Sequence, residues 1–344
     1  MSASVRARAR GPSGSRRALR RAAVLLVLST SLLASLAIGA VSALPPAPVA
    51  RLTAEEARAA GVGMSLVERA DLAGGLLELR VDAAGAAPEL LAVAPGGARA
   101  ATAPALGLDP TTLSVVHPDG SHLNVNLDGV VGAAFAPDSE TLLVVDGGGT
   151  LQRIGLAAGT LAVVADGPFL GPLAVDEDGS VLLLAVSSVE APFRSRLVRL
   201  DPTSGEAKQL AEDDLVYGAQ ELTDGSLAVV AHQRGGGTVV RRVADGVITL
   251  LADLGAGAVN VAVARDGRTL AWERQGEGVF VADDPGARPR RLGPGSRPTF
   301  APDGASLLVR DEDGGHVLVT LAGSRTRLSG PAAFGASCTG RCRS

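Results

Sequence analysis

Aromatic residues are scarce in this sequence, at 2% of its 344 residues, and Trp272 and Tyr217 are the single examples of their kinds. So few rings argue against a site that stacks on sugars or cages a cation. A hydrophobic content of 46% against a charged content of 20% still predicts a folded chain with a buried core. That core must consist mainly of Leu, Val and Ala.

Motifs for nucleophilic catalysis and for phosphate binding are also missing. No Gly-x-Ser-x-Gly sequence occurs, and no motif suggests a Ser/His/Asp trio. The triple-glycine runs at 147–149 and 235–237 lack the Gly-Lys-Ser/Thr and the following helix that a phosphate loop requires. We interpret both runs as hairpin turns, and we predict no catalytic residue.

Acidic charge dominates once the N-terminus is set aside. Residues 1–43 carry seven Arg and no acidic residue, whereas the rest of the chain holds 25 basic and 36 acidic residues, a net charge of −11. An acidic body repels phosphate backbones. Nucleic acid is therefore not an expected partner.

The N-terminus has the pattern of an export signal. Residues 1–21 form a basic n-region that would stay cytoplasmic, and residues 22–43 form an uncharged, mostly apolar run. Cleavage near Ala43 would release the body, whereas an uncleaved run is long enough to anchor it in the membrane. Both alternatives predict that the body is exported across the cytoplasmic membrane.

Short segments flank the body on both sides. Residues 44–65 begin with a Pro-rich spacer, and Thr53-Ala54-Glu55-Glu56 is a capping box that predicts a short helix over 54–60. The C-terminal tail, 333–344, holds Cys338 and Cys342, which we expect to form a local disulfide in an exported chain. A redox-active or intermolecular pair is the alternative.

A turn motif recurs about every forty residues through most of the chain. Its clearest copy is Phe300-Ala301-Pro302-Asp303-Gly304, where an apolar run enters a Pro-Asp-Gly turn and another leaves it. A period near forty with four short strands per unit indicates a β-propeller. The copies, separated by 42, 40, 46, 42 and 37 residues, lie at Pro95, Pro137, Glu177, Thr223, Arg265 and Pro302.

The repeats also resemble a known family. Phe135-Ala136-Pro137-Asp138 and Phe300-Ala301-Pro302-Asp303-Gly304 are similar to the F-S-P-D-G-x-x-L core of TolB-like (WD40-like) propeller repeats, and the resemblance covers about residues 90–330. We therefore expect an all-β propeller of four-stranded blades over 66–332. Six blades are predicted, five of them clear and one degenerate near Pro95. The segment 76–81 is a candidate strand for closing the ring.

The repeated Asp residues favour a structural role. An Asp in such a turn accepts hydrogen bonds from the backbone two residues on. The residues concerned are Asp138, Asp178, Asp224, Asp266 and Asp303.

A second resemblance concerns metal binding. The segment 257–267 is similar to a segment of calcium-dependent lactonase propellers, in which an inner-strand Asn binds the metal in the central channel. Of the metal ligands that this resemblance implies, a Glu, two Asn and an Asp, only one Asn has a counterpart here, Asn260. Gln220 and Glu221 lie on the neighbouring inner strand but do not complete the ligand set. Asn260 and Gln220 are nevertheless the inner-strand polar residues that we expect to bind a ligand.

These observations predict an exported, non-enzymatic β-propeller that binds an envelope or secreted protein, or another ligand, outside the cytoplasm. We expect no cofactor, with calcium as the alternative. A metal-dependent, lactonase-like hydrolase and a structural envelope component are the competing functions. The membrane would be a partner only through an uncleaved N-terminal segment.

Overall fold

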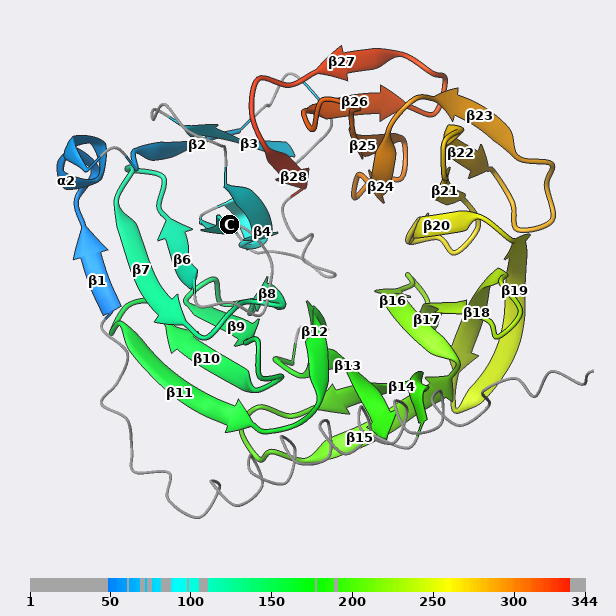
Figure 1. Cartoon of the computed structure of the whole chain (residues 1–344), viewed down its shortest axis with the longest axis horizontal. Coiled ribbons are helices and arrows are strands. Elements are labelled where there is room, and N and C mark those ends of the chain that lie inside the picture. Colours follow the sequence, from blue (N-terminus) through cyan, green and yellow to red (C-terminus); the bar gives the residue numbers. More distant parts are fainter. Residues whose placement is uncertain are drawn as a thin grey trace, which may run out of the picture. The chain divides into compact units, whose positions relative to one another are not determined.

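The chain forms a ring of seven antiparallel β-sheets in the computed structural model (Figure 1). The ring belongs to one compact unit, Ala47–Ser344. The predicted signal or anchor and the Cys338/Cys342 pair lie outside the described residues. No helix in the described part of the chain is long and apolar enough to span a membrane. The structure describes residues 49–60, 62–68, 72, 76–81, 88–97, 99–104, 111–176, 178–188 and 191–334.

Five sheets are regular four-stranded blades, in which consecutive strands run from the centre of the ring outward (Figure 1). Their alternating direction returns the chain to the end of the ring where each inner strand began. All inner strands therefore run the same way. The strands are β8 (Gly132–Phe135), β9 (Thr141–Val145), β10 (Leu151–Gly155), β11 (Thr160–Ala165); β12 (Phe169–Val175), β13 (Val181–Ser188), β14 (Ala191–Leu200), β15 (Ala207–Asp213); β16 (Leu215–Glu221), β17 (Leu227–His232), β18 (Thr238–Ala244), β19 (Val247–Gly255); β20 (Ala258–Val263), β21 (Leu270–Arg274), β22 (Gly278–Ala282), β23 (Arg290–Gly293); β24 (Ser296–Phe300), β25 (Ser306–Arg310), β26 (His316–Thr320) and β27 (Arg325–Arg327).

The blade near Pro95 has a fifth strand. Its own strands are β4 (Glu89–Val93), β5 (Ala100–Ala103), β6 (Thr111–Val116) and β7 (His122–Leu127), with a short 3-10 turn, η2 (Pro95–Gly97), after β4. The fifth strand, β1 (Val49–Leu52), pairs antiparallel with the outer edge of β7. The helix α2 (Ala54–Ala59) follows β1, and the capping box between Thr53 and Glu56 forms as predicted.

The seventh blade corrects the predicted count of six. It consists of β2 (Met64–Glu68), β3 (Leu76–Val81) and β28 (Ala332–Phe334). The six turn motifs do mark six sheets, but this blade combines segments from both ends of the ring and so contains no repeat of its own. The prediction that 76–81 closes the ring is confirmed, since β3 pairs with β28. Buried Glu78 on β3 also accepts the Ser329 N–H at 2.5 Å.

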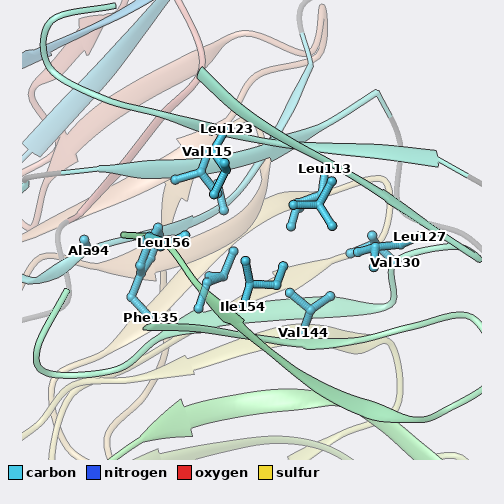
Figure 2. Packing of buried hydrophobic residues seen from close by; sticks show 13 residues of the cluster. Ala94, Leu113, Val115, Leu123, Leu127, Val130, Phe135, Val144, Ile154 and Leu156 are labelled. Atoms are coloured by element: carbon cyan, nitrogen blue, oxygen red, sulfur yellow. The ribbon is translucent and has the colours of Figure 1, made fainter. Parts of the chain in front are cut away.

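The core lies between the faces of neighbouring blades. Figure 2 shows the cluster between the β4–β7 blade and the β8–β11 blade, which includes Leu113 and Val115 from the first blade and Val144 and Ile154 from the second. All four side chains are fully buried. The largest fully buried side chains are leucines and an isoleucine, as expected from the shortage of aromatic residues.

The two ends of the ring differ in chemistry. We call the end where the inner strands begin the entry end, and the end where they finish the turn end. The repeated Asp turns join the first and second strands of the blades, so they lie at the turn end.

Candidate functional site

The repeated Asp residues build the turn end. In each case Oδ1 accepts the backbone N–H two residues on, at 2.8–3.0 Å, which confirms the structural interpretation. Neighbouring blades also meet here, since the Thr223 N–H donates to the Arg265 carbonyl at 2.8 Å. The turns thus satisfy their own backbone N–H groups, which accounts for the repeated Asp without a ligand.

Gln220 lies at the turn end, as the penultimate residue of β16. Its Nε2 donates to the carbonyl of the adjacent Glu221 at 3.0 Å. Partial burial, followed by the negative charge of Asp176, raises the pKa of Glu221. Gln220 is therefore held locally, beside a carboxyl group that binds its proton more tightly than usual.

Asn260 lies at the entry end, on the inner strand β20. Its backbone is left-handed, with φ of 48°, and the pairing of β20 with β21 shifts register between Val259 and Ala262. The exposed side chain donates through Nδ2 to Oε2 of Glu273 on β21 at 2.6 Å. A bulge therefore presents this amide at the ring's entry end.

Arg297 on β24 repeats this geometry in the next blade. Its φ is also 48°, and it too sits in a register shift, between Ser296 and Thr299. Its backbone N–H points to the same Oε2 of Glu273 at 3.3 Å. Its guanidinium lies 3.3 Å from Oε1 of Glu89, the first residue of the inner strand β4. Together these contacts connect three blades at the entry end.

A groove of about 360 Å³ opens beside Glu273. It lies between the β20–β23 and β24–β27 blades, and its lining includes Arg274, Arg291, Glu277, Asp311 and Glu312. The Arg274 guanidinium is 3.7 Å from the Glu277 carboxylate and lies over the Phe280 ring, 4.7 Å from its centroid. The candidate site thus has an inner part, around Arg297, and this charged groove beside it.

Metal ligation by Asn260 finds little support in the surrounding residues. In the described ranges, no three His, Cys, Asp or Glu side chains converge as a metal site requires. Asn260 is bonded to Glu273, and a guanidinium already lies beside the Glu89 carboxylate. The arrangement is better suited to holding a polar ligand through hydrogen bonds and charge.

The structure separates the two predicted ligand-binding residues, because Asn260 lies at the entry end and Gln220 at the turn end. It also adds three residues that the sequence analysis missed, namely Arg297, Glu273 and Glu89. One signal could have revealed Arg297, since both Asn260 and Arg297 precede their repeat Asp by six residues. At the same position other repeats have Gly132, Pro172 and Gly218.

Comparisons with known proteins show which solved structures share this fold. No protein-family model matches the sequence, and no curated protein matches it. TolB from Acinetobacter baumannii is similar in structure, with a TM-score of 0.50 and 17% identity over 85% of this chain and 87% of that one. A protein named as a 6-phosphogluconolactonase from Bacteroides fragilis has a TM-score of 0.50 and 16% identity, over 80% of this chain and 96% of that one.

These identities establish architecture and not activity, because binding proteins and enzymes share the same propeller. The turn motifs, the seven sheets and the structural likeness agree on one conclusion. The chain is an all-β propeller with the fold that TolB also has.

Proposed function

We propose that this protein is an exported, non-enzymatic binding module whose ligand or protein partner docks at the entry end. The export rests on residues 1–43 of the sequence, with the membrane anchor and the cleaved signal both open. The entry-end site consists of Asn260, Glu273, Arg297 and Glu89, together with the adjoining groove.

One observation carries the proposal. Two non-glycine residues in neighbouring blades have left-handed backbones at the same repeat position, and both contact one carboxylate. Such conformations cost about 1 kcal/mol or more each and cluster at ligand-binding sites. The equivalent residues in three other repeats are Gly132, Pro172 and Gly218, so these two side chains are not required by the fold.

The proposal can be tested by site-specific photocrosslinking in cells that make the full-length chain. A photoreactive phenylalanine analogue replaces Arg297 at the entry end or, as the matched control, Asp303 at the turn end. We expect a discrete adduct from position 297 that is absent from position 303. The same adducts from both positions, or none from position 297, would contradict binding at the entry end.

Metal analysis distinguishes the competing enzymatic function. The competing function from the sequence is a metal-dependent, lactonase-like hydrolase, and the chain is also similar in structure to a protein named as a 6-phosphogluconolactonase. Calcium bound at one equivalent in the purified protein, and lost in Asn260→Ala, would replace our proposal by that one. A structural envelope component would instead give crosslinks that are spread over both ends of the ring.

A further inference from the structure

The outer edge of β19 stands apart from the other blade edges. β19 has nine residues, and three of its large apolar side chains are exposed: Val247 by 61%, Ile248 by 43% and Leu250 by 63%. Between Val247 and Ala252 it carries no charge. Long, apolar, uncharged edges offer free backbone N–H and C=O groups to another strand.

Charges protect most of the other outer strands. Lysine, arginine and acidic side chains on an edge hinder pairing with another chain. β11 carries no charge, but it is shorter than β19, with six residues. The charged residues are Lys208, Glu212 and Asp213 on β15, Arg290 and Arg291 on β23, and Arg325 and Arg327 on β27.

The same molecule shows how a blade edge accepts an added strand. β1 pairs antiparallel with the outer edge of β7 over four residues, from Val49 with Val125 to Leu52 with His122. Arg51 on this added strand donates from its guanidinium to the Leu156 carbonyl, 2.8 Å away in the next blade. An extended segment with a basic residue is therefore a fitting fifth strand in this fold. In the part of the chain that the structure describes, β19 pairs only with β18.

Acidic residues at both ends of β19 define the charge of a suitable partner. Exposed Asp245 lies in the turn before β19, and exposed Asp253 lies near its end. They lie eight positions apart, which corresponds to about 26 Å along a fully extended chain. A partner strand with basic residues at that spacing and an apolar centre would complement the edge.

We propose that the β19 edge binds an extended segment of another polypeptide, with an apolar centre and basic flanks, by antiparallel strand addition. The backbone of the partner would supply hydrogen bonds, and its alternating side chains would cover Val247, Ile248 and Leu250. This surface is separate from the entry-end site and does not depend on the function proposed for it.

Designed peptides test the proposal on the purified full-length chain. The probe has nine residues, alternating Val and Thr between two terminal Lys, and a fluorescent label for anisotropy. We expect it to bind roughly tenfold or more tightly than a twin with terminal Glu. A twin with N-methylated alternate amides should not bind, because it cannot form the ladder. Hydrogen exchange of the β19 amides should slow when the first peptide is bound.

Protein variants locate the binding edge. Leu250→Lys places a charge on the exposed edge and should weaken binding roughly tenfold or more, whereas Val163→Lys on β11 should leave it unchanged. Val163 is 64% exposed, so the two substitutions are matched in environment. Equal binding of the Lys and Glu peptides, or an equal response of both variants, would overturn the proposal. So would a dimer of the free protein that Leu250→Lys dissociates, because the edge would then serve a second copy of the chain.

Discussion

The same blades form the turn end and the entry end of the ring. Equivalent residues of the repeats are alike at the turn end and differ at the entry end. At the turn end, five equivalent Asp residues make the same hydrogen bond to the backbone. At the entry end, the equivalent residues of neighbouring repeats differ. Asn260 binds Glu273 within its own blade, and Arg297 reaches across blades to Glu273 and Glu89. Features that recur from blade to blade maintain the fold. Features that depart from the repeat are the better guide to function.

The largest expected effect tests the turn end. Gly267 has φ of 70°, and an added Cβ would lie 2.8 Å from Cδ1 of buried Leu222. Gly267→Ala should therefore lower the free energy of unfolding by about 2 kcal/mol, from the left-handed backbone together with the contact. Chemical denaturation measures the change.

Gly225 provides the matched control for this substitution. It occupies the corresponding turn with φ of 77°, and nothing lies within 4 Å of an added Cβ. Gly225→Ala should lower the free energy of unfolding by about 1 kcal/mol, from the backbone alone. Equal losses in both variants would show that the turns are not packed as the structure indicates.

The pH dependence of the free energy of unfolding tests the histidines at both ends of the ring. Desolvation lowers the pKa of His117 and of buried His122 at the turn end, and of His316 at the entry end. The unfolded chain then binds these protons more readily, so stability should fall as pH drops below about 6.5. The slope is about 1.4 kcal/mol per pH unit for each proton taken up.

His122 is the histidine to replace, because it is 2% exposed. No charged group contributes to the shift of its pKa. His122→Phe should flatten the decline in unfolding free energy between pH 6.5 and 5. An unchanged slope would assign the decline to His117 and His316.

A smaller effect should separate strain from hydrogen bonding at the entry end. Asn260→Ala and Asn260→Gly both remove the amide that binds Glu273, but only Gly relieves the left-handed backbone. We expect Ala to cost about 1 kcal/mol of stability and Gly to cost less than about 0.5 kcal/mol. Similar losses in the two variants would mean that the hydrogen bond, and not strain, dominates.

The smallest expected effect is that of Arg297→Ala. The Arg297 side chain is 59% exposed, and its guanidinium nitrogen lies 3.3 Å from Oε1 of Glu89. An exposed ion pair contributes about 0.5 kcal/mol or less, and the backbone cost is the same for Arg and Ala. Thermal unfolding should therefore change little. A loss of more than about 1 kcal/mol would make Arg297 a brace between blades.

Local patterns in the sequence predict much of this fold, because the turn at Asp303 and its copies are specified by adjacent residues. The capping box at Thr53 is local in the same sense. The sequence did not predict the seventh blade, because its strands come from segments far apart in the chain and contain no turn motif. The approach of Glu89 to Arg297 joins residues 208 positions apart, and no spacing within one repeat encodes it. Only the offset of six residues between Arg297 and Asp303 could have pointed to the site in advance.

The closure between β3 and β28 also sets the timing of folding. These strands share one sheet, yet Ser329 contacts Glu78 across 251 positions in the chain. Ribosomes add about 5–20 residues per second, so about ten to fifty seconds separate the synthesis of the two strands. During that interval the edge of β3 has no partner, and closing so long a loop makes the last step slow. The nascent chain therefore passes through an open ring that a chaperone or another strand could reach.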